Sequence, residues 1–463
     1  MTPSSTRRSF LHTALGAGAF ALRPAFAAAP PAAVTWLTPQ DKAYAAARRP
    51  YNSTITTQPL MIARCLREDG VVQAIARAAA EGKGVAVKSG GHSFEGFGLN
   101  DDGLVVDVSQ MNRVVLDKES GIVTAGPGCL LGKMNQTLLA QGRLLPSGSC
   151  ASVGLAGLVL GGGYGLFARQ FGLTCDHLES LRLVDGEGNV RDSREEPELL
   201  WACRGGGNGH FGVVTEFRLR THAAPSRLHA FRFRLARLDA IRARELLEAW
   251  FAATAALPEN AFCAFVLNGN FLSVLLTTTG SPENKGVAAL RKRLTGLGMK
   301  PTVSKAVPLA AALPRYYGNA GPIAFKNASG GYYESFAHLA PALPGVLEET
   351  LHTPGLIFQV NTLGGAIARG PDGAYPHRRF PWLGEWQAYW EHESQREKLL
   401  AATARVRAHL AAGGITRHYA NYPDKAFKDW PKAYYDAGYA RLQALKKKLD
   451  PANRVRHPQS VRA

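Results

Sequence analysis

The sequence lacks the cysteine and histidine patterns that are typical of metal sites. Its 463 residues include six cysteines, with no CxxC pair and no Cys/His ligand spacing, at positions 65, 129, 150, 175, 203 and 263. We therefore expect no bound metal. The cysteine spacing names no disulfide, and a chain of this size needs none.

Long apolar runs and the common nucleotide-binding fingerprints are also missing. After the first 30 residues, no segment is apolar and long enough to span a membrane. The chain has no Walker A loop and no complete G-x-G-x-x-G fingerprint, because Gly161–Gly165 matches only in part. With 46% hydrophobic and 19% charged residues, the composition excludes a disordered or fibrous chain.

Acidic residues are scarce relative to basic ones. The 36 Asp and Glu residues stand against 54 Lys and Arg, which gives a formal net charge of +18. Such a surplus fits nucleic acid, an anionic surface, an acidic substrate or a polyanionic cofactor. The basic residues are scattered and form no stripe with aromatics, so we expect no nucleic-acid partner. We interpret them as a solvated basic surface, suited to an anionic substrate or envelope.

The first 29 residues are predicted to be a targeting signal. Arg7 and Arg8 precede Phe10 and Leu11 and an apolar run that ends at Leu22, and small residues follow at 25–29. This order resembles a bacterial twin-arginine signal, which exports folded proteins. We therefore expect export to the periplasm or the medium. The alternative is a basic N-terminus beside an ordinary helix.

The composition changes along the chain. Residues 36–222 alternate short apolar runs with turns and glycine clusters, which predicts mixed helices and strands. Residues 223–412 alternate charged amphipathic helices with strands, and this shift indicates a second domain. Residues 413–463 carry aromatics and then a basic helix at about 442–449.

One loop has the composition of an anion site. Lys88-Ser89-Gly90-Gly91-His92-Ser93 follows a strand predicted at 85–88. Consecutive small residues leave backbone N–H groups free to point one way, which suits phosphate oxygens. A tight structural turn is the alternative.

A second element changes the interpretation of this loop. Gly148–Gly157 contains Cys150 and a C-x-x-V-G-x-x-G pattern, and it runs into the glycine cluster at Gly161–Gly165. Together with S-G-G-H, these motifs resemble the FAD-linked oxidases of the vanillyl-alcohol oxidase superfamily, with a PCMH-type FAD-binding domain, and within it the berberine bridge enzyme-like group. Further matching segments are 107–112, 171–177, 200–207, 211–215, 421–424, 450–453 and 457–460.

The resemblance implies an α+β fold. A two-part FAD domain, formed by 36–222 and closed by 413–463, would enclose a substrate domain at 223–412 with a mainly antiparallel sheet flanked by helices. FAD would be attached twice, through His92 and Cys150. The residues expected at the cofactor are Lys88, Ser89, Gly90, Gly91, His92, Ser93, Gly96, Cys150, Val153, Gly154, Gly157, Gly162, Tyr164, Gly165, Val214, Asn421 and Tyr422. Lys88 stands where the family often has Arg, which removes bidentate geometry but keeps the charge.

By the same resemblance, two tyrosines lie at the flavin face. Tyr422 is the expected general base and Tyr164 its partner; the alternative is that both only pack on the flavin ring. Gln359 and Asn361 alternate along a predicted strand, so they share a face and are expected to contact substrate. Sugar-oxidising relatives place an acid near the second position, and Asn361 cannot be that anion. The resemblance also implies that Val153 borders the flavin, where its small side chain is expected to favour reaction with oxygen.

The expected reaction is hydride transfer from a CH–OH group to bound FAD, followed by reoxidation by O2 to H2O2. A carbohydrate or other hydroxylated small molecule is the first candidate substrate. The alternatives are an alcohol or amine oxidoreductase of secondary metabolism, and a flavin-binding protein without turnover. Six aromatics are further candidates for substrate stacking or for the core: Tyr316, Tyr317, Tyr332, Tyr333, Trp382 and Trp386. His377 matches a recurrent motif of the family and is expected to be structural.

Overall fold

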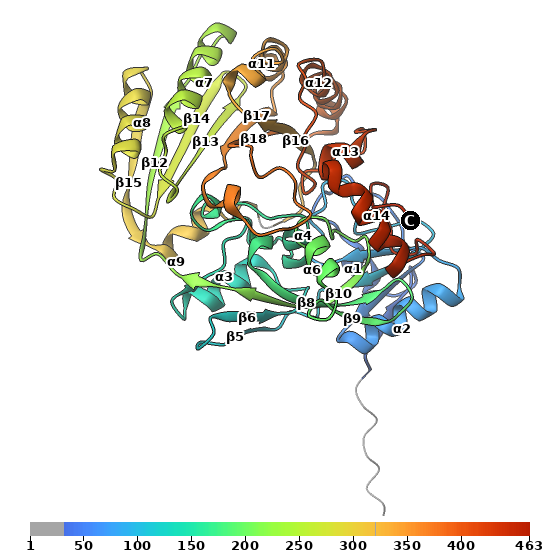
Figure 1. Cartoon of the computed structure of the whole chain (residues 1–463). Helices are drawn as coiled ribbons and strands as arrows, with labels where there is room; N and C mark the ends of the chain where they lie inside the picture. Colours follow the sequence, from blue (N-terminus) through green and yellow to red (C-terminus); the bar gives the residue numbers. More distant parts are fainter. Residues whose placement is uncertain (1–31, 320) are drawn as a thin grey trace, which may run out of the picture. The chain divides into compact units, whose positions relative to one another are not determined.

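The computed structural model describes residues 32–319 and 321–463 (Figure 1). Ala33–Ala463 forms one compact unit, so the domain boundaries at 222 and 412 stay a prediction. The targeting signal predicted at 1–29 lies outside the described residues. Within the described ranges no helix is long and apolar enough to cross a membrane.

The first sheet ends at the loop predicted to bind phosphate. Its strand order is β1-β2-β4-β3, and β4 is parallel to both of its neighbours. The elements of this part are β1 (Val34–Leu37), α1 (Tyr44–Arg48), β2 (Met61–Cys65), α2 (Glu68–Ala80), β3 (Val85–Lys88) and β4 (Leu104–Asp107). Strand β3 is the strand predicted at 85–88, and the S-G-G-H loop follows it directly.

A second, antiparallel sheet carries the helix that follows the Cys150 loop. Its order is β5-β6-β10-β8-β9, and β7 pairs with β11 beside it. The strands are β5 (Val114–Leu116), β6 (Ile122–Ala125), β7 (Arg143–Leu144), β8 (Leu178–Asp185), β9 (Val190–Asp192), β10 (Gly212–Arg220) and β11 (His222–Ala223). The helices are α3 (Leu131–Leu139), α4 (Leu155–Leu160), α5 (Ala168–Phe171) and α6 (Pro197–Cys203). The apolar core under this sheet includes Leu155 and Val159 of α4.

The antiparallel sheet predicted for 223–412 is present and has seven strands, in the order β15-β12-β14-β13-β17-β18-β16. They are β12 (Arg227–Leu235), β13 (Ala261–Asn268), β14 (Phe271–Thr278), β15 (Lys300–Pro308), β16 (Phe325–Tyr333), β17 (Leu356–Thr362) and β18 (Trp382–Tyr389). The helices are α7 (Ala240–Thr254), α8 (Lys285–Gly296), α9 (Leu309–Ala312), α10 (Phe336–Leu339), α11 (Leu343–His352) and α12 (Glu393–Ala412).

One face of this sheet is covered and the other is partly open. Helices α7, α8, α11 and α12 lie on the same side (Figure 1), where Phe231, Phe233 and Phe265 pack against them in the largest apolar core. Strand residues alternate between faces, so the intervening side chains of β12 point away from the helices. Arg232 and Arg234 of this second face are exposed. The seven strands therefore present a separate, more polar surface.

The C-terminal segment joins the first sheet. It contains α13 (Trp430–Tyr435) and α14 (Tyr439–Leu449), and Val455 pairs with Val85 at the start of β3. A buried ion pair stabilises the turn between the end of α14 and Val455. Lys446 Nζ is 2.7 Å from Asp450 Oδ2 and also donates to the carbonyl oxygen atoms of His210 and Val455. Both charged side chains are fully buried, so each depends on the other for solvation.

We predict that Asp450→Ala lowers the free energy of unfolding by about 3–5 kcal/mol, because it leaves a buried ammonium group without its counter-charge. Urea unfolding of the holoenzyme measures this loss. The control is Lys448→Ala, which removes an exposed ion pair with Glu196 and costs about 0–1 kcal/mol. Equal losses in the two variants would contradict a special role for the buried pair.

Candidate active site

The loop after β3 presents unpaired backbone donors. Among the described residues, the N–H groups of Gly90, Gly91, His92 and Ser93 have no hydrogen-bond acceptor. Gly91 has φ of 71°, in the left-handed region that favours glycine. Lys88 is only 8% exposed, and its ammonium group makes no salt bridge or hydrogen bond within the described ranges. A buried cation beside free N–H groups is suited to a phosphate anion.

The Cys150 loop packs directly on this first loop. A Cβ atom on Gly90 would lie 2.4 Å from the nitrogen of Gly154, and one on Gly154 would lie 2.4 Å from the nitrogen of Gly90. Real Cβ atoms do not come that close, so both positions require glycine. His92 Nε2 also shares a hydrogen bond of 3.0 Å with Ser152 Oγ. The two loops are therefore held in one fixed arrangement.

His92 and Cys150 lie near a common neighbour, Tyr51. The Tyr51 ring stacks on His92 with centroids 3.9 Å apart, and its pKa is raised by burial and by the Cys150 thiol. Burial lowers the pKa of His92 to about 4, so its imidazole is neutral at pH 7. Cys150 is half-buried, whereas the other five cysteines are buried. A neutral imidazole and an accessible thiol beside an anion-binding loop fit the chemistry of an attached FAD.

Four predicted residues form one hydrogen-bonded chain. The hydroxyl oxygens of Tyr164 and Tyr422 are 2.6 Å apart. Asn361 Nδ2 donates to Tyr164 Oη at 3.1 Å, and Gln359 Nε2 donates to Asn361 Oδ1 at 2.8 Å. The chain joins the loop after α4, strand β17 and the C-terminal segment. The structure therefore brings together both predicted catalytic tyrosines and both predicted substrate residues.

The tyrosines are poor bases without help. Burial raises the pKa of Tyr164 and of Tyr422 well above the usual value for a phenol. Each hydroxyl is therefore protonated at neutral pH and can accept a proton only if it passes one on. The prediction that Tyr422 acts as the base thus requires a nearby proton acceptor.

Glu385 of β18 is a candidate proton acceptor that the sequence motifs do not indicate. It pairs directly with Gln359 of β17 and is 5% exposed. Burial raises its pKa to about 7, and the side chains of Gln387 and Tyr422 act in the opposite direction. The carboxylate also raises the pKa of Tyr164, Tyr422 and Cys150, which places it among them. The available signal was a single acid within the apolar run 382–386.

Comparison with known proteins identifies the family. Residues 59–194 match the family described as FAD binding domain, and residues 418–462 match Berberine and berberine like. The FAD-linked oxidoreductase YvdP of Bacillus subtilis is 30% identical over 444 residues, which cover 91% of this chain and 96% of YvdP. The chain belongs to the berberine bridge enzyme-like FAD-linked oxidoreductases.

The fold agrees with this family. The aclacinomycin-N/aclacinomycin-A oxidase of Streptomyces galilaeus is 29% identical over 480 residues, which cover 89% of this chain and 87% of that oxidase. The solved structure of a chitooligosaccharide oxidase is 27% identical, covers 93% of this chain and 97% of its own, and superimposes with a TM-score of 0.84. The predicted α+β fold and the predicted FAD cofactor are confirmed.

In this berberine bridge enzyme-like site, Asn421 positions protein groups. Its Oδ1 accepts from Asn208 Nδ2 at 2.7 Å, and its Nδ2 donates to the carbonyl of Leu158 and to Tyr419 Oη. Tyr419 Oη in turn accepts from the nitrogen of Gly163 at 2.8 Å. The side-chain amide of Asn421 is used by the protein, so this residue supports the site through its neighbours.

The remaining predicted cofactor residues differ in their surroundings. Gly162 and Gly96 have positive φ, and Gly165 is pressed against the carbonyl of Ser147. Gly157 of α4 faces open space, because a Cβ atom added there would lie 3.9 Å from its nearest neighbour, Asn208 Oδ1. Val153 packs at the margin of the core in which Val214 of β10 is buried.

Most of the aromatic candidates are core residues. Tyr332, Tyr333, Trp382 and Trp386 are buried, so they are not available for stacking on a substrate. His377 is also buried and donates from Nε2 to the carbonyl of Ala433, as expected for a structural residue.

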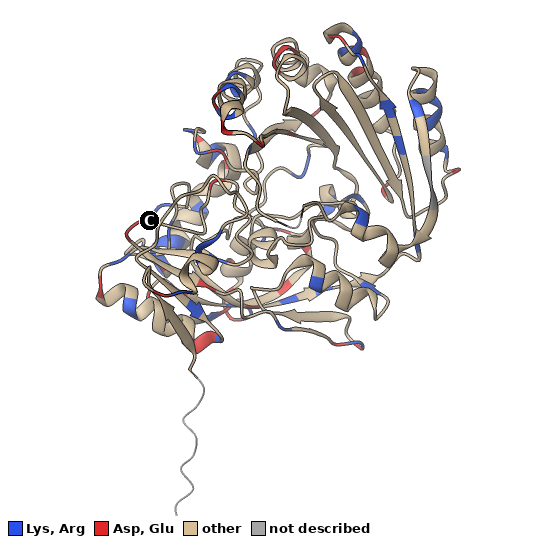
Figure 2. Ribbon diagram, turned by 180° about the vertical axis from the view of Figure 1, so that it is seen from behind, with Lys and Arg blue, Asp and Glu red and all other residues tan. Residues whose placement is uncertain are grey.

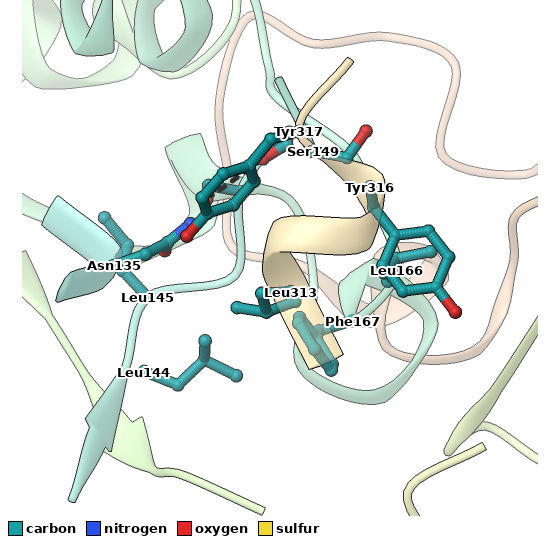
Figure 3. Close-up of a pocket in the computed structure, with 11 residues that line it drawn as sticks. Asn135, Leu144, Leu145, Ser149, Leu166, Phe167, Leu313, Tyr316 and Tyr317 are labelled. Atoms are coloured by element: carbon teal, nitrogen blue, oxygen red, sulfur yellow. Dashed lines mark hydrogen bonds between the residues drawn. The ribbon is translucent and has the colours of Figure 1, made fainter. Parts of the chain in front are cut away.

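Tyr316 and Tyr317 differ from these four because they are only half-buried. They line a small pocket with Leu313, Ser149 and Asn135 (Figure 3). Its volume of about 10 Å³ barely admits one water molecule, so it is no substrate site. Instead it marks where the segment 313–318 packs on the loop before Cys150. The nitrogen of Ala151 donates to the carbonyl of Tyr317.

We predict that Glu385→Gln changes how stability depends on pH. The folded-state pKa of Glu385, about 7, lies above the ordinary value of 4.5. Its contribution to stability is therefore fully present below about pH 4.5 and is lost as the pH rises through 7. The wild type should lose melting temperature over this interval more steeply than Glu385→Gln, measured by thermal unfolding from pH 4 to 8.

The control is Glu248→Gln, which changes an exposed carboxyl of α7 and should leave the pH profile as in the wild type. Parallel profiles for the wild type and Glu385→Gln would contradict the raised pKa.

Proposed function

We propose that this oxidoreductase oxidises a CH–OH group of a carbohydrate or another hydroxylated small molecule. The observation that carries the proposal is the chain Tyr422–Tyr164–Asn361–Gln359 beside the buried carboxylate of Glu385. Such a chain suits a substrate hydroxyl, which must be bound and must lose a proton. Related enzymes carry the names chitooligosaccharide oxidase and xylooligosaccharide oxidase, at 29% and 27% identity.

Bound FAD supplies the acceptor for the hydride that leaves the substrate carbon. The protein handles the proton. Tyr422 Oη accepts it from the substrate hydroxyl, and the proton of Tyr422 passes toward the carboxylate of Glu385. Because the pKa of Glu385 is about 7, about half of the molecules hold this carboxylate ionised at neutral pH. Gln359 and Asn361 orient the substrate and hold Tyr164 in place.

FAD is, in this proposal, attached through both His92 and Cys150. His92 Nδ1 has no hydrogen-bond partner among the described residues, while Nε2 is held by Ser152. Cys150 is the half-buried thiol of the chain. Two attachments would keep the cofactor in place and pull electron density from it, which favours the acceptance of hydride.

Molecular oxygen is the proposed electron acceptor. Val153 lies at the margin of a core and is half-buried, and a small side chain there leaves room for oxygen near the flavin. The expected product is one H2O2 for each substrate molecule oxidised.

A secondary-metabolite alcohol or amine is the second candidate substrate. The aclacinomycin oxidase of Streptomyces galilaeus and the chitooligosaccharide oxidase of Gibberella zeae are equally similar to this chain, each at 29% identity. The acid–base chain serves either substrate, because both lose a hydride and a proton.

Export through a twin-arginine signal is also proposed, on the basis of residues 1–29. Replacing both Arg7 and Arg8 by Lys should keep the yellow holoenzyme inside the cell, because twin-arginine export requires the arginine pair. Fractionation of a bacterial expression host measures this, with Arg23→Lys as the control. Unchanged export of the double variant would contradict the proposal.

We predict that Tyr422→Phe slows flavin reduction by substrate about 10²–10⁴-fold, because the hydroxyl that receives the proton is lost. Anaerobic stopped-flow absorbance on a panel of sugars and alcohols gives the rate, and a peroxide assay under air gives the acceptor. Tyr439→Phe, which alters a tyrosine at the start of α14, is the control. A near-normal rate for Tyr422→Phe would reject the assigned role.

We predict that acid-denatured wild-type protein keeps its flavin and yields flavin adducts on the peptides that contain His92 and Cys150. His92→Ala and Cys150→Ala should each lose one adduct, and only the double variant should release free flavin on denaturation. Mass spectrometry distinguishes these cases. Cys203→Ala, at a buried thiol, should behave as the wild type, and release of flavin from the wild type would contradict the attachment.

A further inference from the structure

The second, partly open face of the seven-stranded sheet leads away from the active site. Opposed residues of antiparallel strands share a face, and one row runs across five strands. Glu385 pairs with Gln359, Gln359 with Val266, Val266 with Ser273, and Ser273 with Arg234. This row connects the proton acceptor to an arginine near the edge of the sheet.

The arginine end of the row is a cluster of positive charge. Arg234 pairs with Lys300 of the edge strand β15, and Arg232 lies two residues away on the same face. All three side chains are exposed. None of them forms a salt bridge within residues 32–319 and 321–463. Lys and Arg recur on these edge strands in Figure 2.

A separate segment brings the same cluster close to the Cys150 loop. Arg232 and Arg315 both act on Tyr316, opposing the rise in its pKa that burial causes. The segment itself packs on β12, because Leu313 and Tyr316 share an apolar cluster with Leu228. The same segment reaches Cys150, because a Cβ on Gly318 would lie 3.1 Å from its sulfur atom. Two independent paths, the sheet register and segment 313–318, thus connect the cations to the reaction site.

The spacing suits an extended ligand. Neighbouring strands lie about 4.8 Å apart, so three steps from β17 to β12 cover about 14 Å. The face between them carries half-buried Val266, Ser273 and Leu275. A small alcohol bound at Gln359 cannot reach the arginines, whereas a chain of a few sugar units can.

We propose that Arg232 and Arg234, with Lys300 and Arg315 beside them, bind an anionic group on the far end of the substrate, and that the substrate is an acidic oligosaccharide. This inference rests on the proposed function and specifies its substrate class. Arginine binds a carboxylate through two parallel hydrogen bonds. Tyr316 offers a ring for a sugar unit next to the charge.

Three trisaccharides of the same β-1,4 linkage test the proposal: the glucose trimer, the glucuronate trimer and a 6-sulfated glucose trimer. We expect the wild-type holoenzyme to show a kcat/KM about tenfold or more higher for an acidic trimer than for the neutral one. The preference should fall toward 1 M salt, where charges are screened within about 3 Å. A preference for the sulfated trimer alone would identify sulfate as the bound anion.

The double variant R232Q/R234Q should lower kcat/KM for the acidic trimer about tenfold or more, through KM and with little change in kcat. The control is Arg293→Gln, which removes one exposed arginine of α8 on the helix-covered side of the sheet. It should keep the wild-type preference. Calorimetry of the glucuronate trimer should show weaker binding to R232Q/R234Q than to the wild type.

The outcomes separate the two proposals. Equal kcat/KM for acidic and neutral trimers in the wild type would overturn the anionic subsite and leave carbohydrate oxidation standing. No oxidation of any trimer or other hydroxylated compound would overturn the proposed function. In that case, unchanged calorimetric binding in R232Q/R234Q would overturn the subsite as well.

Discussion

The contact between Gly90 and Gly154 is the constraint on which the site depends. The two backbones approach so closely that a single added carbon atom at either position would collide with the other loop. This contact places the loop with free N–H groups, which carries His92, against the loop that carries Cys150. Because backbone atoms make the contact, no side-chain rearrangement can relax it. The rest of the site is arranged around this junction.

A second constraint comes from burial of the tyrosines. A phenol that is removed from water holds its proton more tightly, so burial keeps Tyr164 and Tyr422 protonated. The same burial keeps the carboxyl of Glu385 partly protonated near neutrality. Burial thus raises the pKa of the phenols and of the carboxyl group alike, and the neutral form of each is favoured.

The local parts of the structure were predictable and the long-range parts were not. Strand β3, the glycine loop after it and the alternation of Gln359 and Asn361 follow from short patterns. The family motifs also led to both tyrosines. Glu385 was missed because only the register of β18 against β17 brings it beside Gln359. The burial of Tyr332 and Trp386 also depends on packing between distant segments, which composition does not reveal.

The bond between Tyr164 and Tyr422 joins positions that are 258 residues apart. During synthesis the chain emerges from its N-terminal end, so the first sheet and the S-G-G-H loop are available long before Tyr422 leaves the ribosome. The turn after α14, which brings Val455 back to β3, is synthesised later still. An incomplete chain therefore has an anion-binding loop but no acid–base pair. The two tyrosines can meet only after the C-terminal segment has been synthesised and has packed against the rest of the protein.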